Sequence, residues 1–308
     1  MNIKNKEKIR IPEHLQQIIE ESNIGIKLPN NLTYNKFLGN NSSNIQKATQ
    51  KYDYQPDKEL YEIKLPKPPI QLANQLYGQF YNHEKVPENT QLYAMVNGAT
   101  FPLKIDYTTK GFSEKTLYAK KPNTNRLIGH FLHNIISDTR IKIGYNEELF
   151  VEEEVPGTIL LEENDQLLYI MPEYQKSIGK AAARSEFLGL HDVSHPRNRL
   201  INKTHETNLF DFDNIFEPTT KTSKLNPLIK LYHNQEKLTP IMIQSYREEK
   251  KEIARRIITH KNIVYEFMNA VDNLFDETYG TIKEKIKLFS GQNSSLEYIQ
   301  KQTKLFAQ

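Results

Sequence analysis

Alternating apolar and polar positions between residues 90 and 122 predict three consecutive β-strands. The segments QLYAMV and TFPLKIDY flank Asn97-Gly98, a dipeptide typical of a tight hairpin turn. The segment KTLYAKKP (115–122) continues the pattern, and Pro122 closes it because proline cannot donate a sheet hydrogen bond. We expect these segments to form an antiparallel sheet.

The spacing changes to a helical period after the third strand. Residues 123–137 carry apolar side chains three and four positions apart, which predicts an amphipathic helix. These side chains are Leu127, Ile128, Phe131, Leu132, Ile135 and Ile136. Asn123 or Thr124 is placed to cap the helix.

Two further strands and a second helix are expected between residues 158 and 189. The segment TILLEENDQLLYIMPEY (158–174) predicts strand, turn and strand, with the turn at Asn164-Asp165. Residues 177–188 predict a helix, and Gly189 suits its end because glycine readily adopts a left-handed conformation.

The stretch GLHDVSHPRNRLINKTHETNLFDFD (189–213) combines a predicted hairpin with two polar positions. Asn198 precedes strand-like Leu200-Ile201, and Asp211 follows the apolar pair Leu209-Phe210. Thirteen positions separate Asn198 from Asp211, a length that suits a β-hairpin returning Asp211 beside Asn198. An amide oxygen and a carboxylate placed together can hold a divalent metal on a triphosphate.

Composition narrows the class of protein. The 308 residues suffice for one large or two moderate domains, and 26% charged against 37% apolar residues indicate an ordinary soluble, cytoplasmic protein. The formal charge of +3 is too small to argue for nucleic acid. The absence of cysteine excludes disulfides, thiolate metal sites and a cysteine nucleophile. No apolar run approaches the ~18 residues that a transmembrane helix needs, and the N-terminus lacks a signal-peptide core.

The spacing of His191, Asn198 and Asp211 resembles the catalytic loop H-R-D-x-x-x-x-N and the D-F-G metal loop of the protein-kinase-like superfamily. The resemblance covers roughly residues 90–217. It implies an α+β, two-lobed fold with a small antiparallel β-sheet lobe and a reduced, mostly helical C-terminal lobe. The implied domains are an N-terminal extension with a helix and a Pro-rich connector (1–87), a small lobe with hinge (88–174) and a large lobe with the catalytic and metal loops (175–308).

The resemblance also implies ATP and Mg²⁺ or Mn²⁺, with Asn198 and Asp211 as metal ligands. Asp213 either assists with a second metal or caps the loop. The loop continues as Asp-Phe-Asp instead of Asp-Phe-Gly, an ending similar to that of small-molecule phosphotransferases and other atypical kinases.

The catalytic acid is displaced relative to the family pattern. Val193 stands where the Asp is expected, and Asp192 lies one residue earlier. Asp192 is the expected acid that orients the acceptor hydroxyl, and the alternative is a structural Asp in a pseudokinase. His195 stands where many kinases carry a phosphate-contacting Lys, and it either contacts phosphate when protonated or packs within the loop.

Two lysines compete to grip the ATP phosphates at the end of the third strand. Strand alternation puts Lys120 and Lys121 on opposite faces. Lys121 is preferred, because Ala119 lies two residues before it, as in V-A-I-K, and Pro122 follows it.

Other family features are missing or shifted. No G-x-G-x-x-G precedes the lysines, and the helix at 125–137 has no Glu to pair with them, so Asp138 or one of Glu152 to Glu154 would have to substitute. The segment LLYIMPEY resembles the fifth strand and hinge, which implies that Met171 and Glu173 border the adenine pocket.

A basic helix is predicted at residues 245–261, where Arg247, Lys250, Lys251 and Arg255 are neighbours on a helical surface. Interleaved glutamates partly neutralise this face. It is either a solvated, salt-bridged helix or an anion site for a polyphosphate, a phosphoinositide headgroup or an acidic partner.

Together these features predict an atypical ATP-dependent kinase that transfers the γ-phosphate to a protein hydroxyl. The chain resembles minimal kinases that intracellular bacterial pathogens inject into eukaryotic hosts, including a kind activated by inositol hexakisphosphate. That resemblance implies a host protein substrate and secretion without a signal peptide. The alternatives are a lipid or small-molecule phosphotransferase, and a pseudokinase that binds nucleotide or phosphoinositide as an interaction module.

Overall fold

The computed structural model describes most of the chain, and it divides into two compact units. The described residues are 11–41, 61–82, 87–96, 102–109, 112–155, 157–159, 168–190, 193, 199–209, 212, 215–216, 226–272, 283–284, 286–288 and 290–308. The sheet unit comprises Met1–Ile11, Ile19–Asn123 and Ile141–Glu154, and the helical unit comprises Pro12–Ile18, Thr124–Arg140 and Val155–Gln308.

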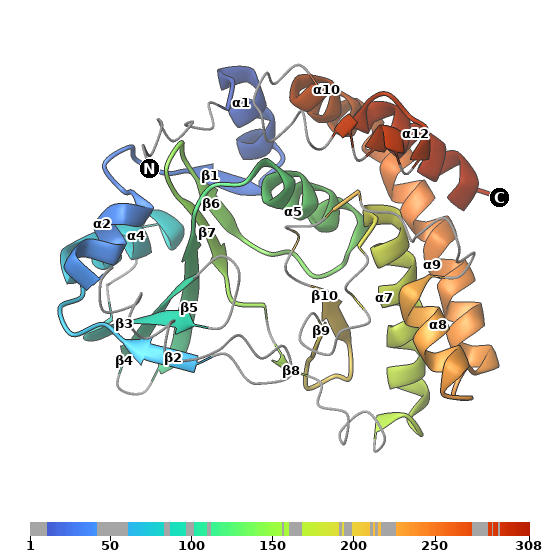
Figure 1. Cartoon of the computed structure of the whole chain (residues 1–308), viewed down its shortest axis with the longest axis horizontal. Helices are drawn as coiled ribbons and strands as arrows, with labels where there is room; N and C mark the ends of the chain where they lie inside the picture. Colours follow the sequence, from blue (N-terminus) through green and yellow to red (C-terminus); the bar gives the residue numbers. More distant parts are fainter. Residues whose placement is uncertain are drawn as a thin grey trace. The chain divides into compact units, whose positions relative to one another are not determined.

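Seven strands form one sheet in the described part of the sheet unit (Figure 1). Their order across the sheet is β1-β6-β7-β5-β4-β3-β2. The strands are β1 (Gly25–Lys27), β2 (Tyr61–Lys64), β3 (Asn89–Val96), β4 (Leu103–Thr109), β5 (Phe112–Lys120), β6 (Ile143–Tyr145) and β7 (Phe150–Glu153). Neighbours are antiparallel except for β1 beside β6. The three predicted strands are thus confirmed as β3, β4 and β5.

One face of this sheet is apolar and is covered by helices α2 (Tyr34–Leu38) and α4 (Ile70–Phe80). Leu103, Ala119 and Val151 lie on this face and are fully buried. The hydroxyl of the buried Tyr107 on β4 donates to the backbone oxygen of Ala73 on α4 at 2.6 Å. Burial of these side chains stabilises the unit by roughly 25 cal/mol for each Å² of apolar surface removed from water.

The β6–β7 hairpin is an addition to the strands predicted from the sequence. Asn146 organises its turn: its backbone N–H donates to Leu149 O at 2.9 Å, and its Oδ1 accepts from Glu148 N at 2.8 Å. The Asn146 side-chain amide also donates to the backbone oxygens of Pro29 (2.9 Å) and Leu32 (2.8 Å). These bonds fix the hairpin against the segment that follows β1.

The helical unit is built mainly from helices, which are α5 (Thr124–Ile136), α7 (Pro172–Leu188), α8 (Pro227–Asn234), α9 (Pro240–Thr259), α10 (Lys261–Asp272) and α12 (Ser295–Phe306). α1 (Glu13–Glu21) begins in this unit and ends in the sheet unit. Helices α7 and α9 run side by side (Figure 1) and approach closely at Gly179, where a Cβ atom would lie 2.9 Å from the Cβ of Ser245. Phe131 of α5 stacks on Phe267 of α10 with ring centroids 3.6 Å apart.

Helix α7 corrects the expectation of a strand extending to residue 174. Leu168 is helical, and Tyr169 and Ile170 form a turn. Met171 is the N-cap of α7, and Pro172 is its first residue. Proline suits this position because it needs no N–H there and its φ is already helical. The predicted end of the helix is confirmed, since Gly189 is its C-cap at φ 66°.

A small second sheet lies in the helical unit, with strand order β10-β9-β8 in its described part. Its strands are β8 (Thr158–Ile159), β9 (Arg199–Ile201) and β10 (Thr207–Leu209). β9 and β10 form the hairpin predicted from the sequence, with Arg199 opposite Leu209. Arg199 and Leu209 thus form the open end of the hairpin.

The described elements form an α+β fold in two compact units, one mainly of strands and one mainly of helices. Three antiparallel strands, a helix, two further strands, a second helix and a hairpin follow one another along the chain. β1 and β2 precede residue 88 and belong to the same sheet as the later strands. In the described part of the chain no helix combines the length and apolar character that crossing a membrane requires.

Candidate nucleotide and metal site

The second face of the large sheet is polar, and charged and hydroxyl side chains pair across its strands. Lys104 on β4 contacts Glu62 on β2 at 3.0 Å and Asp106 at 3.3 Å. The Thr116 hydroxyl on β5 donates to Asp106 at 2.9 Å, and the Tyr118 hydroxyl donates to Glu154 at 3.1 Å. The polar side chains of this face are therefore held by cross-strand hydrogen bonds and ion pairs.

Lys120 lies at the end of β5 on this polar face and forms an ion pair with Glu152 of β7. Only 8% of the Lys120 side chain and 10% of the Glu152 side chain are exposed. The register explains the contact: Lys120 is opposite Phe150 and Tyr118 is opposite Glu152, so the two charged residues are diagonal neighbours on one face. From the sequence, Glu152 is among the acids that could pair with the lysine in place of a helix Glu. The Lys120–Glu152 pair depends on the β6–β7 hairpin, which brings β7 beside β5.

The side chain of Lys121 lies near an aromatic ring and not beside Glu152 as that of Lys120 does. Its ammonium lies 5.7 Å from the centre of the Tyr34 ring, on the first residue of α2. Because α2 covers the apolar face of the sheet, Lys121 belongs with that face and Lys120 with the polar one. The contacts thus separate the two lysines: Lys120 pairs with Glu152, and Lys121 lies beside Tyr34.

The predicted loop residues Asp192, His195, Asn198, Asp211 and Asp213 lie outside the described residues. Among the described residues no group of three or more His, Asp or Glu side chains is arranged to hold a metal ion. Val193, which stands at the family's catalytic Asp position, is 2% exposed. An apolar side chain is therefore buried at that position.

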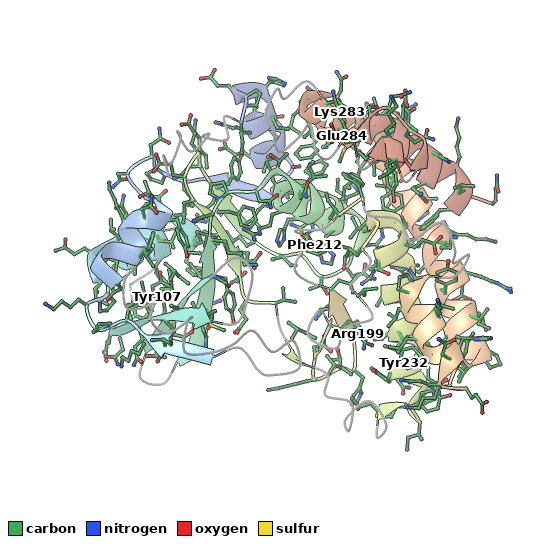
Figure 2. All side chains as sticks on the ribbon, viewed as in Figure 1. Tyr107, Arg199, Phe212, Tyr232, Lys283 and Glu284 are labelled. Atoms are coloured by element: carbon green, nitrogen blue, oxygen red, sulfur yellow. The ribbon has the colours of Figure 1, made fainter. Side chains whose placement is uncertain are left out.

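The hairpin next to this loop is anchored firmly to the helical unit. The Ser177 side chain of α7 accepts from Thr207 N at 2.7 Å and donates to the Thr207 hydroxyl at 2.6 Å. Arg199, the first residue of β9, is buried, and its Nη1 donates to the Tyr232 hydroxyl of α8 at 3.4 Å (Figure 2). Helix α8 thus contacts the open end of the hairpin at Arg199, and helix α7 contacts its turn end at Thr207.

Phe212 lies between the two predicted metal-ligating aspartates in sequence, and α5 packs against it (Figure 2). Phe212 is fully buried, and its ring is 4.8 Å from that of His130 and 5.1 Å from that of His133. Gly129 makes this approach possible, because a Cβ atom there would lie 3.0 Å from the Cγ of Phe212 and closer still to its Cβ. Sequence periodicity identified the helix but gave no signal for this contact.

His133 is neutral in the folded protein over the physiological pH range. Burial, with Arg184 and His130 nearby, lowers the pKa of His133 from 6.5 to about 3. A buried imidazole beside a guanidinium group would be destabilised by its own positive charge.

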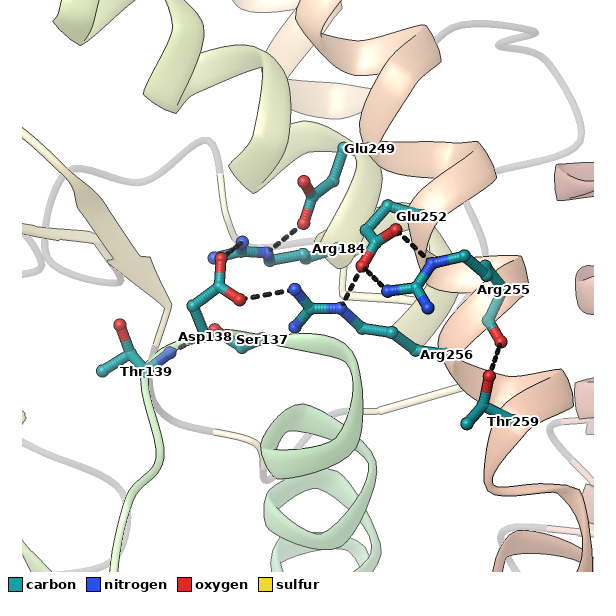
Figure 3. A network of polar contacts seen from close by, with 9 residues as sticks. All are labelled: Ser137, Asp138, Thr139, Arg184, Glu249, Glu252, Arg255, Arg256 and Thr259. Carbon is teal, nitrogen blue, oxygen red and sulfur yellow. Dashed lines mark hydrogen bonds and ion pairs between the residues drawn. The ribbon is translucent and has the colours of Figure 1, made fainter.

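A network of ion pairs links the segment after α5 to helices α7 and α9 (Figure 3). Arg184 on α7 donates to Glu249 on α9 at 2.7 Å and lies 3.9 Å from Asp138. Arg256 on α9 pairs with the same Asp138 and with Glu252 at 2.8 Å. The hydrogen bond from Arg256 lowers the pKa of Asp138 below its usual value. Asp138 was one candidate acid for the missing helix Glu, and here it pairs with arginines.

The basic surface of α9 is partly neutralised. Lys250 pairs with Glu186 at 2.9 Å and lies 4.3 Å from the centre of the Phe306 ring, and Arg255 pairs with Glu252 at 2.6 Å. Arg247 and Lys251 are exposed and line an open groove along α9. The groove is also lined by Pro240, Ile243, Gln244 and Glu248. The arrangement is closer to the salt-bridged helix than to a four-residue anion site.

Met171 and Glu173 belong to the start of α7. The backbone N–H of Met171 donates to Leu168 O at 2.9 Å, and Glu173 is an exposed residue of the first helical turn. The chain passes from the sheet unit to the helical unit between Glu154 and Val155, directly after β7. Met171 and Glu173 therefore lie at the beginning of a helix of the helical unit, 17 and 19 positions after this crossing.

Comparison with known proteins adds little to these contacts. No protein-family description matches the chain, and no curated protein matches it either. Among solved structures it is similar to the open conformation of CtTel1, with 12% identity and a TM-score of 0.44 over 89% of this chain. It is also similar to the FAT and kinase domain of CtTel1, with 12% identity and a TM-score of 0.44 over 87% of this chain. The chain spans 14% and 27% of those two structures, and a likeness at this level identifies no activity and no site residue.

Proposed function

We propose that this protein is an atypical ATP-dependent kinase that transfers the γ-phosphate to a protein hydroxyl. The observation that carries the proposal is the buried Lys120–Glu152 ion pair at the end of β5, on the polar face of the antiparallel sheet. A lysine at this point of the sheet supplies a localised positive charge for the ATP phosphates. Met171 and Glu173, at the start of α7, are the residues proposed to border the adenine.

The proposed metal site uses Asn198 and Asp211, with Asp213 beside them. The hairpin register supports it, because Arg199 and Leu209 are paired at the end where the chain continues to these residues. Amide and carboxylate oxygens suit Mg²⁺ or Mn²⁺, which would neutralise the phosphate charge. Asp192 would orient the acceptor hydroxyl, and His195 would contact the transferred phosphate.

Calorimetric titration with ATP tests the metal assignment. Asp211→Ala should abolish Mg²⁺- or Mn²⁺-dependent ATP binding while the circular dichroism spectrum stays that of the parent protein. Asp272→Ala is not a suitable control, because that carboxylate accepts hydrogen bonds from the first turn of α12. Glu236→Ala, at an exposed position after α8, is the matched control and should bind ATP normally. ATP affinity unchanged in Asp211→Ala would reject the site.

A pseudokinase that binds nucleotide without transferring phosphate is the second candidate. The buried Val193 favours it, because the residue at the catalytic Asp position is apolar and enclosed. Metal-dependent ATP binding without phosphate transfer to protein, lipid or small-molecule acceptors would identify this alternative. Transfer of the γ-phosphate to a lipid or a small molecule would identify a lipid or small-molecule phosphotransferase.

Activation by inositol hexakisphosphate in a host cell is a separate proposal. Arg247 and Lys251 are the candidate contacts, since Lys250 and Arg255 are paired with carboxylates. Inositol hexakisphosphate should raise thermal stability and phosphorylation, and charge reversal at both residues should remove the two effects. Activation that persists after these charge reversals would exclude the groove along α9 as the binding site for inositol hexakisphosphate.

A further inference from the structure

We propose that Glu152 is the positioning residue for the phosphate-binding Lys120, so that a strand of the sheet unit orients the lysine. This inference rests on the proposed kinase function. It explains how the chain can dispense with an acid in α5, whose sequence TNRLIGHFLHNII contains no carboxylate. The orientation of Lys120 then depends on the pairing of β5 with β7 and not on the placement of a helix.

The position of the pair fits this role. Lys120 is the last residue of β5, and Glu152 is the third residue of β7. One carboxylate can accept one or two of the three ammonium N–H groups, which leaves at least one N–H for a phosphate oxygen. Because both side chains are nearly enclosed, the attraction between them is screened less than that of an exposed pair.

The surrounding sheet holds both partners in place. Ala119 and Val151, which flank the pair in sequence, are opposite each other on the apolar face and fully buried. On the polar face, Tyr118 precedes Lys120 by two residues and hydrogen-bonds to Glu154, two residues after Glu152. Two parallel cross-strand contacts therefore fix the β5–β7 register at this end of the sheet.

The neighbouring acids have other partners. Glu153 accepts a hydrogen bond from the Tyr81 hydroxyl at 3.0 Å, on the opposite face of β7. Asp138, the other acid near the end of α5, pairs with Arg256 and Arg184. Of the acids that the sequence suggested as partners of the lysine, Glu152 is the one that forms an ion pair with Lys120.

Steady-state kinetics of phosphate transfer, with ATP as the varied substrate, tests the role. Glu152→Gln keeps the shape of the side chain but removes its charge, and it should raise the KM for ATP at least tenfold. Glu152→Asp keeps the charge on a shorter side chain and should raise it severalfold. Glu153→Gln, the adjacent acid on the other face, should leave the KM within twofold of the parent value. A parent-like KM in both Glu152 variants would overturn the inference.

Labelling of the Lys120 amine gives a readout that needs no activity. An amine-reactive reagent, followed by mass spectrometry of the folded protein without nucleotide, should modify Lys120 slowly. Glu152→Gln should accelerate that modification several-fold, whereas Glu153→Gln should not, and equal rates in all three proteins would contradict the positioning role. If Glu152→Gln does not fold, Glu152→Asp decides both measurements. A parent protein that binds no ATP would reject the kinase function itself, while the labelling still reports whether Glu152 holds Lys120.

Discussion

Gly129 is the single residue whose substitution should most directly disturb the predicted metal loop. A Cβ atom at this position would overlap Phe212, which lies between Asp211 and Asp213 in sequence. We expect Gly129→Ala to destabilise the fold by about 1–3 kcal/mol through overpacking, and to weaken metal-dependent ATP binding by displacing Phe212. Urea unfolding and calorimetry measure the two effects.

Gly291→Ala is the control for that substitution. Gly291 has φ 72°, and a Cβ atom there would meet nothing within 4 Å. The change should cost only backbone strain and leave ATP binding intact. Equal loss of ATP affinity in the two alanine variants would show that the Gly129–Phe212 contact does not support the site.

His133 should make stability depend on pH in the acid range. The unfolded chain protonates this imidazole below pH 6.5, whereas the folded protein keeps it neutral down to pH about 3. Its contribution to stability is therefore present above pH 6.5 and is lost as pH falls toward 3, by up to about 1.4 kcal/mol per pH unit.

His133→Gln should flatten this dependence between pH 6.5 and 4.5 in urea unfolding followed by circular dichroism. His233→Gln, which changes an exposed histidine of α8, should retain the parent slope. The same slope in His133→Gln and in the parent protein would mean that His133 is not held neutral by the fold.

Between elements, the ion pairs of Figure 3 differ in burial and should differ in their contribution to stability. Arg184 and Glu249 are 8% and 5% exposed in their side chains, whereas Arg255 is 66% exposed. Arg184→Ala leaves the Glu249 carboxylate buried without this partner, which should cost about 3–5 kcal/mol. Arg255→Ala should lower the free energy of unfolding far less, since its pair with Glu252 is solvated.

Urea unfolding midpoints of these two variants provide the comparison. The double variant Arg184→Met/Glu249→Leu should recover most of the loss, because replacing both charges removes the unpaired carboxylate. Comparable destabilisation by Arg184→Ala and Arg255→Ala would show that the buried pair does not link α7 to α9 as described.

The sequence predicted those elements in which apolar residues recur at a regular spacing. β3, β4, β5 and α5 follow alternation or a helical repeat, and the β9–β10 hairpin follows from its spacing. The β6–β7 hairpin was missed because Glu152, Glu153 and Glu154 are typical of a solvated loop. All three carboxylates have tertiary partners, which are Lys120, Tyr81 and Tyr118. Such cross-strand partners are invisible until the sheet order is known.

For the same reason, local sequence could not give the surroundings of the two lysines at the end of β5. Alternation correctly placed Lys120 and Lys121 on different faces, but local sequence does not say which face is polar. Which face is apolar depends on α2 and α4. These helices cover it and come from a part of the sequence that precedes the predicted strands. The start of α7 at Pro172 was misjudged because an apolar run before a proline suits both a strand end and a helix N-cap.

For the molecule as a whole, the α+β organisation places the proposed phosphate lysine and the predicted metal ligands in different units. Lys120 belongs to the sheet unit, and Asn198 and Asp211 belong to the helical unit. Each unit has buried apolar side chains of its own, such as Leu117 in the sheet unit and Ile253 in the helical unit.

Transfer of label from γ-labelled ATP to protein acceptors, in Mg²⁺ and in Mn²⁺, tests the proposed function most directly. The parent protein should phosphorylate an acceptor or itself, with and without added inositol hexakisphosphate as separate arms. Lys120→Met and Asp211→Asn should each lower the rate at least a hundredfold while remaining folded, whereas Lys121→Met should retain activity. Absence of transfer from the folded parent protein, or transfer that persists in the Lys120 and Asp211 variants, would contradict the account.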